Sequence, residues 1–112
     1  MKILVTGGNG FIGSSLVQAL HARGDRLIVI DRGLPRTDMD WSGVDYRQGD
    51  FADPAVLEDA LRGCGMVCHL ASTTVPGTAN LDPASDVRGN LLGTMLLVDA
   101  MAKAGCNRII YL

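Results

Sequence analysis

Residues 2–13 read KILVTGGNGFIG, a short apolar segment that leads into a glycine-rich turn. The β-branched stretch at residues 2–6 is typical of a buried parallel strand. A helix is predicted from Phe11 to Arg23, because apolar residues recur there at helical spacing and Gly24 follows as a C-terminal cap. The residues predicted to face the core from this helix are Ile12, Leu16, Ala19 and Leu20. A strand, a tight turn and a helix are thus expected in direct succession.

The remainder of the chain alternates strand and helix patterns. Further strands are predicted at residues 26–30, 44–48, 66–70 and 108–112. A helix capped by Asp53 and Pro54 is expected to end at Gly63, and a long helix is expected over residues 83–104. Residues 32–43 show no sustained period and are interpreted as an irregular connection. This order predicts an α/β, Rossmann-like doubly wound parallel sheet with strand order 3-2-1-4-5.

Composition and charge narrow the class of protein. The 112 residues suffice for one domain, and 47% hydrophobic with 20% charged residues is typical of a packed globular chain. A formal charge of −2 without a basic stripe argues against a nucleic-acid partner. With neither a signal peptide nor an apolar stretch of about 18 residues, a soluble cytoplasmic protein without a membrane partner is expected. The three cysteines lack C-x-x-C spacing and are interpreted as buried reduced thiols.

The glycines at positions 7, 10 and 13 have the spacing and the context of a phosphate-binding turn, because they follow a strand and open a helix. In such a turn Gly7 allows the tight bend, Gly10 lets a pyrophosphate approach the backbone, and Gly13 lets the helix pack close to the strand. The helix N-terminus adds free N–H groups and the positive end of the helix dipole. A turn with only a packing role is the alternative interpretation, which the surrounding strand and helix disfavour.

Asp31 follows the second predicted strand, 18 residues after Gly13. A carboxylate at that place can accept hydrogen bonds from both hydroxyls of an adenosine ribose and would repel a 2′-phosphate. The pattern therefore predicts NAD rather than NADP as the cofactor. Arg32 keeps NADP open as the second choice, because its guanidinium offers a partner to a phosphate. The alternative interpretation is that Asp31 is a solvated turn residue without a ligand.

The segment Thr6–Gly13, TGGNGFIG, resembles the fingerprint of extended short-chain dehydrogenases/reductases, in particular the NAD-dependent nucleotide-sugar epimerase and dehydratase branch (UDP-glucose 4-epimerase-like). The likeness continues through GDF at 49–51, CHLAS at 68–72 and NLLGT at 90–94, and so covers the whole chain. The resemblance implies backbone contacts to the pyrophosphate, a ribose contact, adenine contacts and a cofactor-lining loop after the fourth strand. With the glycine turn, the predicted cofactor-binding residues are Gly7, Gly10, Phe11, Ile12, Gly13, Asp31, Arg32, Asp50, Phe51, Leu70, Ala71, Ser72 and Thr73.

No metal or catalytic residue is assigned. His69 is interpreted as a packed strand residue, because no second histidine or carboxylate stands nearby at ligand spacing. Members of the resembled family activate the substrate hydroxyl with a tyrosine and a lysine four residues later. Neither Tyr46 nor Tyr111 is followed by such a lysine. The chain is therefore interpreted as the N-terminal, NAD-binding portion of a longer enzyme, truncated after strand five and inactive alone.

The leading function is the NAD-binding portion of a nucleotide-sugar epimerase or dehydratase, which would oxidise C4 of the sugar by hydride transfer. The alternatives are another extended-family NAD(P)-dependent reductase and a non-catalytic NAD-sensing module; a flavodoxin-like phosphate-binding domain is disfavoured. The nucleotide sugar is expected as a partner only of the full-length protein. Self-association is expected through the edge of the last strand or through the helix at 83–104, whose apolar residues leave little polar face.

Overall fold

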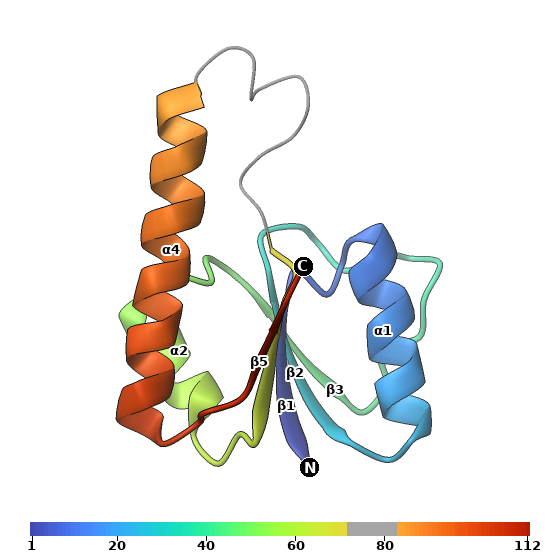
Figure 1. The fold of residues 1–112 in the computed structure, drawn as a ribbon. Coiled ribbons are helices and arrows are strands. Elements are labelled where there is room, and N and C mark those ends of the chain that lie inside the picture. Colours follow the sequence, from blue (N-terminus) through green and yellow to red (C-terminus); the bar gives the residue numbers. More distant parts are fainter. Residues whose placement is uncertain (72–82) are drawn as a thin grey trace.

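The computed structural model describes residues 1–71 and 83–112, which form an α/β sandwich around one parallel sheet (Figure 1). The strands follow the order β3-β2-β1-β4-β5, which confirms the predicted Rossmann-like topology. They are β1 (Lys2–Thr6), β2 (Arg26–Asp31), β3 (Val44–Gln48), β4 (Met66–His69) and β5 (Ile109–Tyr111). The chain builds the sheet outward from β1 to β3 and then crosses to β4. The switch point of this topology therefore lies between β1 and β4.

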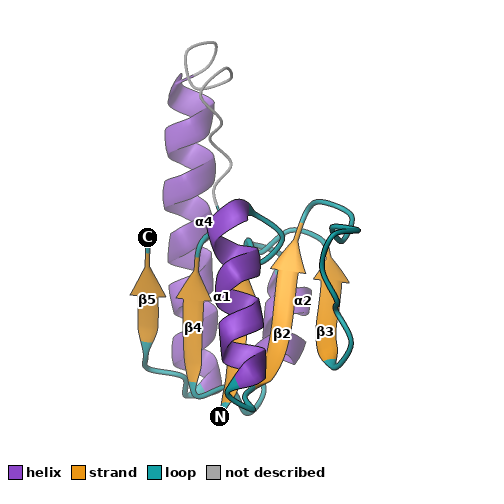
Figure 2. Ribbon diagram, turned by 90° about the vertical axis from the view of Figure 1, so that its right-hand side faces the viewer, coloured by secondary structure: helices purple, strands orange, loops and turns teal. Residues whose placement is uncertain are grey.

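Helices cover both faces of the sheet (Figures 1 and 2). Helix α1 (Phe11–Ala22) lies on one face, and α2 (Pro54–Leu61) and α4 (Pro83–Ala104) lie on the other. Right-handed crossovers explain this division. The connection through α1 steps from β1 to β2, whereas the connections through α2 and α4 step in the opposite direction, from β3 to β4 and from β4 to β5. Within the described ranges, no helix is long and apolar enough to cross a membrane.

Each face of the sheet has its own apolar core. Alternate strand residues point to opposite faces, so continuous apolar strands fill both layers. The layer under α1 contains Ile3, Val5, Val17, Leu27, Val29 and Cys68. The layer under α2 and α4 contains Leu4, Ile28, Ile30, Phe51, Leu57, Ala60, Leu61, Val67, Leu97, Met101 and Cys106. All three cysteines are free, and Cys64 is only partly buried, so the expectation of buried thiols holds for Cys68 and Cys106.

The buried face of α1 agrees with the prediction at Leu16 and Leu20, which are partly buried against the core, and differs from it at Ile12 and Ala19. Gly13, Ser14 and Val17 are its buried residues, whereas the side chain of Ile12 is 61% exposed and Ala19 is exposed as well. The helix is rotated because Gly13 packs directly against the turn after β1, where a Cβ on Gly13 would meet the carbonyl oxygen of Gly7. Backbone packing of the turn thus sets the first turn of the helix, while the apolar pattern holds further along it.

The predicted element bounds hold closely, with small differences at the ends. Asp53 caps α2 as predicted, its side chain accepting a 3.0 Å hydrogen bond from the backbone N–H of Ala55. That helix ends at Leu61, because the chain then turns at Gly63, which has φ +78°. β4 ends at His69 and β5 covers three residues, so both strands are shorter than the apolar pattern indicated.

Candidate nucleotide-binding site

The turn between β1 and α1 is held tightly by backbone hydrogen bonds. Gly7 has φ +73°, a left-handed conformation that favours glycine, and its N–H donates to the Ile30 carbonyl of the neighbouring strand at 2.9 Å. Gly10 is the N-cap of α1 and provides no side-chain cap. The N–H groups at the start of α1 are consequently left without a capping side chain and point out of the helix end. Such a helix terminus favours an anion.

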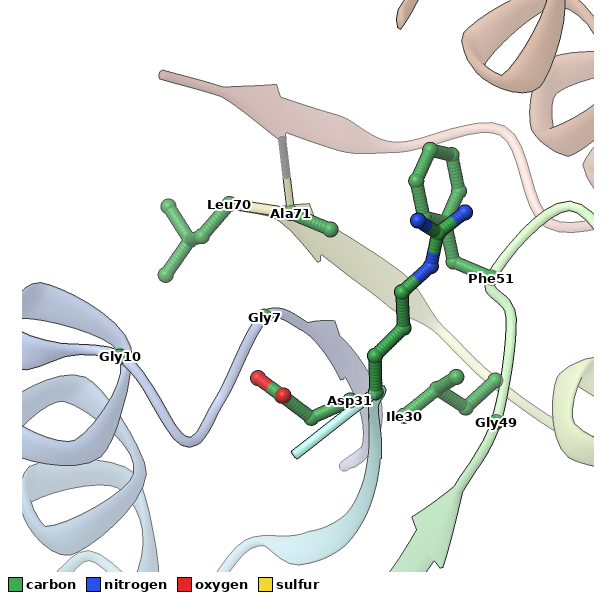
Figure 3. A pocket seen from close by; sticks show the side chains of 9 residues that line it. Gly7, Gly10, Ile30, Asp31, Gly49, Phe51, Leu70 and Ala71 are labelled. Carbon is green, nitrogen blue, oxygen red and sulfur yellow. The ribbon is translucent and has the colours of Figure 1, made fainter. Parts of the chain in front are cut away.

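Asp31 lies beside this turn, at the end of β2. Its Oδ2 accepts a 3.0 Å hydrogen bond from the N–H of Asn9, and its Oδ1 accepts one of 2.8 Å from the N–H of Gly33. Figure 3 shows the carboxylate directed toward the turn that contains Gly7 and Gly10. Each oxygen retains a lone pair beyond its backbone donor. The carboxylate is therefore fixed in direction and can still accept a hydroxyl proton at each oxygen.

The connection after β2 is fastened to the glycine turn by the side chain of Asn9. Its Nδ2 donates to the Leu34 carbonyl and its Oδ1 accepts from the Arg36 N–H, both at 2.8 Å. The Arg36 guanidinium continues to Ser14 Oγ of α1 at 3.0 Å. From the other side, the Tyr46 hydroxyl donates to the Gly33 carbonyl at 2.6 Å. The segment that follows Asp31 is thus ordered by contacts on two sides.

A pocket of about 250 Å³ opens at the carboxyl ends of β1, β2 and β4, next to the switch point (Figure 3). This is where ligands of open α/β sheets bind. Glycine backbone forms one wall, Asp31 and Arg32 form the polar wall, and apolar side chains complete it. The lining residues are Gly7, Gly10, Ile30, Asp31, Arg32, Gly49, Phe51, Leu70 and Ala71.

Most of the residues predicted for cofactor binding lie at this pocket. Phe11 and Ile12 do not line it; they follow Gly10 in the first turn of α1 and are 84% and 61% exposed. Gly13 lies beneath the turn and not in the pocket wall. Asp50 stands at the rim, where it pairs with Arg32. Ser72 and Thr73 fall outside the described residues.

Two lining residues, Ile30 and Gly49, were not among the predicted set. Both stand where a strand ends: Ile30 precedes Asp31, and the Gly49 N–H donates to the Asp31 carbonyl at 2.8 Å. The sequence signal for such residues is that the carboxyl ends of parallel strands meet at one edge of the sheet, where ligands bind. It applies to Ile30 and Gly49, because they adjoin the ends of β2 and β3.

The charged groups at the rim interact weakly. Arg32 Nη2 lies 3.5 Å from Asp50 Oδ2, and both side chains are at least half exposed. An exposed pair of this kind contributes little to stability, so the arginine can turn toward a ligand at small cost. Among residues 1–71 and 83–112, no group of three His, Cys, Asp or Glu side chains could hold a metal ion. Chemically, the arrangement suits an apolar base, a ribose and an anionic phosphate.

Comparisons with known proteins agree with this geometry. The model of the NAD dependent epimerase/dehydratase family matches residues 3–112. A UDP-glucose 4-epimerase of Erwinia amylovora is 30% identical over 99% of this chain, which covers 36% of that protein. Sterol demethylase protein B of Methylococcus capsulatus is 32% identical over 99% of this chain, which covers 34% of that protein.

Solved structures show the same relationship. The UDP-glucose 4-epimerase of Thermus thermophilus, solved in complex with NAD, is 34% identical with a TM-score of 0.84. The match covers 97% of this chain and 36% of that one. The chain thus spans about a third of the length of the relatives it matches, over their dinucleotide-binding fold. Because the family model matches nearly every residue, the chain belongs to the NAD dependent epimerase/dehydratase family.

Proposed function

We propose that this chain binds NAD, with the adenosine half in the pocket at the ends of β1, β2 and β4 and the pyrophosphate at the N-terminus of α1. The observation that carries the proposal is the Asp31 carboxylate, held by the N–H groups of Asn9 and Gly33 beside the glycine turn. A carboxylate fixed there recognises both ribose hydroxyls and disfavours a 2′-phosphate. The family description and the NAD in the Thermus thermophilus complex support the same cofactor.

The residues present fit the parts of a dinucleotide. An adenine base would lie between the apolar side chains of Ile30 and Phe51. The pyrophosphate would meet the backbone at Gly10, where a Cβ has only one atom within 4 Å, the Gly7 carbonyl oxygen at 3.5 Å. The free N–H groups of Phe11 and Ile12 would donate to its oxygens. Leu70 and Ala71, with Ser72 and Thr73 after them, would line the cofactor beyond the pyrophosphate.

We extend the proposal to a nucleotide-sugar epimerase or dehydratase as the full protein, in which NAD would accept a hydride from C4 of the sugar. The support is the family match together with the epimerase relatives. Tyr46 has no lysine four residues later, and we assign these 112 residues cofactor binding. A cofactor-sensing role without turnover is the non-enzymatic alternative.

A second candidate is an NADP-dependent reductase, and Arg32 is the observation that favours it. Its side chain lines the same pocket as Asp31 and, within the described part of the chain, pairs with the exposed carboxylate of Asp50. A guanidinium in that place can form a bidentate pair with a 2′-phosphate. The similarity to sterol demethylase protein B shows that the chain's relatives include proteins named for other substrates.

Calorimetric titration of the chain with NAD and with NADP tests the proposal. We expect NAD to bind more tightly than NADP, and Asp31→Asn to weaken NAD by about tenfold or more, because it removes the charge that attracts both ribose hydroxyls. Asp45→Asn is the matched control, since Asp45 lies on β3 away from the pocket and pairs with Arg47. It should leave the NAD affinity unchanged.

The possible outcomes of this titration distinguish an NAD site, an NADP site and the absence of a dinucleotide site. Tighter binding of NADP than NAD, reduced by Arg32→Ala, would favour the reductase. Binding of neither dinucleotide by a chain that is folded by circular dichroism would contradict the proposed cofactor. Equal loss in the Asp31 and Asp45 variants would show that the Asp31 carboxylate does not act at the ribose.

A further inference from the structure

His69 is the most buried titratable side chain beside the pocket, with 1% of its surface exposed. It ends β4 opposite Thr6 of β1, and its ring lies between those of Phe51 and Tyr111, at centroid distances of 4.8 and 5.3 Å. Its Nε2 lies 3.0 Å from Oγ1 of Thr94 on α4. One imidazole thus contacts two strands, a helix and the loop after β3.

The hydrogen bonds around Thr6 determine where the imidazole proton lies. Thr6 Oγ1 accepts from the backbone N–H groups of Leu70 and Ala71, each at 3.2 Å, and the Leu70 N–H is shared with the Thr6 carbonyl oxygen at 3.0 Å. Its own proton is therefore directed to His69 Nδ1, which lies 2.6 Å away and must accept it. The remaining ring nitrogen, Nε2, then carries the proton and donates to Thr94 Oγ1. Only the neutral Nε2–H tautomer gives every donor and acceptor in this series of hydrogen bonds a partner.

This chain of hydrogen bonds reaches the pocket through the backbone after β4. Leu70 and Ala71 line the pocket (Figure 3). The backbone N of Ala71 lies so close to the glycine turn that a Cβ on Gly7 would be 2.7 Å from it. A displacement of Ala71 would therefore be transmitted to the turn that faces the pyrophosphate.

We propose that His69, as the neutral Nε2–H tautomer, is a positioning residue of the dinucleotide pocket that fixes the backbone of Leu70 and Ala71 through the Thr6 hydroxyl and ties this edge to α4 through Thr94. The inference rests on the proposed binding of NAD. His69 itself does not contact the dinucleotide in this arrangement, and its effect on the cofactor is carried by Thr6.

Protonation of His69 breaks the arrangement. In an imidazolium, Nδ1 would carry a proton that points at Thr6 Oγ1. That oxygen already accepts from the Ala71 N–H and shares the Leu70 N–H with the Thr6 carbonyl, and its own proton would lose its acceptor. Among the described residues, the groups in contact with the ring are Thr6, Thr94, Phe51 and Tyr111, and the phenol of Tyr111 is the titratable side chain in this set. No carboxylate there stabilises the charged ring, and burial lowers the pKa of His69 from 6.5.

The sign of the pH effect follows from the lowered pKa. An unfolded chain takes up a proton as the pH falls through about 6.5, whereas the folded chain resists it, so folded stability decreases on the acid side. NAD affinity should be constant above about pH 6.5 and fall at lower pH as His69 becomes protonated. His21 is the other histidine of the chain, and it is exposed on α1.

Two variants separate positioning from simple packing. In His69→Asn the amide Oδ1 can still accept from the Thr6 hydroxyl, but the contact to Thr94 is lost. In His69→Gln the longer amide reaches toward Thr94 and leaves Thr6 without an acceptor. Both variants leave space in a buried site, so both should lower the melting temperature. Only His69→Gln should weaken NAD binding at about pH 8, by roughly tenfold, because an unsatisfied hydrogen bond remains beside Ala71.

Calorimetry with NAD between about pH 5.5 and about pH 8, with wild type, both His69 variants and His21→Asn, provides the readout. We expect wild type and His21→Asn to lose affinity in acid, and His69→Asn to keep a flat profile. An acid loss that persists in His69→Asn, or equal affinities of the Asn and Gln variants, would overturn the inference while the proposed function stands. Failure of the wild type to bind NAD at about pH 8 would instead overturn the proposed function, and the inference with it.

The tautomer can be read from the wild-type chain without any variant. Nitrogen-15 NMR of the histidine rings distinguishes Nε2–H from Nδ1–H and follows each ring through its titration. We expect His69 in the Nε2–H form with a pKa below 6.5. An Nδ1–H ring, or a ring that is charged at neutral pH, would exclude the proposed arrangement even if the variants failed to fold.

Discussion

The three glycines of the turn after β1 have different steric surroundings. A Cβ on Gly7 would lie 2.7 Å from the N of Ala71, and one on Gly13 would lie 2.9 Å from the Cα of Gly8. A Cβ on Gly10 would meet only the Gly7 carbonyl oxygen, at an ordinary 3.5 Å, and Gly10 has φ −73°, which any residue adopts. The fold therefore requires glycine at positions 7 and 13, while at position 10 the requirement comes from the ligand.

Gly10→Ala should separate folding from cofactor binding. We expect its free energy of unfolding to change by less than about 1 kcal/mol, the usual effect of losing a glycine N-cap, while NAD affinity falls about tenfold because the methyl group occupies the approach of the pyrophosphate. Gly13→Ala should lower both quantities. Thermal unfolding and calorimetry measure the two effects, and undiminished NAD binding by Gly10→Ala would place the pyrophosphate elsewhere.

Tyr46 makes folded stability depend on alkaline pH. Burial, with the charge of Asp31 added, raises its pKa to about 12, and its hydroxyl donates to the Gly33 carbonyl. Because the unfolded phenol ionises near 10.0 and the folded one near 12, the contribution of Tyr46 is complete below about pH 10 and is lost between these values. Urea unfolding at several alkaline pH values should show a steeper loss for wild type than for Tyr46→Phe. Parallel curves would contradict the raised pKa.

At the scale of elements, the connection between β2 and β3 supports the site although it contains no helix or strand, and its first residue, Arg32, lines the pocket. Trp41 packs edge-on against Tyr46, and its Nε1 donates to the Arg36 carbonyl at 3.0 Å. Together with the two hydrogen bonds of the Asn9 side chain, these contacts hold the segment after Asp31 in place. The direction of the Asp31 carboxylate depends on this order, because Gly33 in the same segment is one of its donors.

Asn9→Ala tests that dependence. It removes the hydrogen bonds to Leu34 and Arg36, and we expect a loss of about 1–3 kcal/mol in the free energy of unfolding together with a several-fold loss of NAD affinity. Hydrogen exchange at the Arg36 amide should quicken. Arg36→Ala is the control, since its backbone N–H still donates to Asn9, and it should have the smaller effect. Faster exchange at Arg36 with unchanged NAD affinity would show that this connection does not shape the site.

The fold could be predicted from the sequence because each strand and helix has its own local apolar pattern. The bounds of β1, β3 and α4 match the patterns directly. For α1, Leu16 and Leu20 follow the apolar pattern, but the burial of Gly13 and Ser14 could not be predicted, because neither residue contributes to a hydrophobic period. For the site, the glycines and Asp31 stood out by spacing, whereas the contacts of Asn9 and His69 join elements distant in sequence and follow no local pattern.

At the scale of the molecule, α4 extends beyond the carboxyl-terminal edge of the sheet (Figure 1). Its 22 residues span about 33 Å, whereas the strands contain three to six residues and rise about 10–20 Å. Only Gly93, Leu97 and Met101 are buried against the core. The spacing of four, four and three residues places Val87, Leu91, Met95 and Val98 on another face of the helix, and each is 48–62% exposed. Val87 and Leu91 of this face line a shallow pocket with Tyr111 of β5. A single chain therefore leaves a helical apolar stripe uncovered.

That stripe predicts self-association of the chain through α4, because pairing with a second copy would remove the apolar side chains from water. β5 is the competing surface, since it is an edge strand of the described sheet with Ile110 half exposed. We favour α4, because three residues of edge strand offer few hydrogen bonds to a partner. Sedimentation velocity should show a dimer that Leu91→Glu converts to monomer and Ile110→Lys leaves intact. The reverse pattern would assign the contact to β5, and a monomer at every concentration would exclude both surfaces.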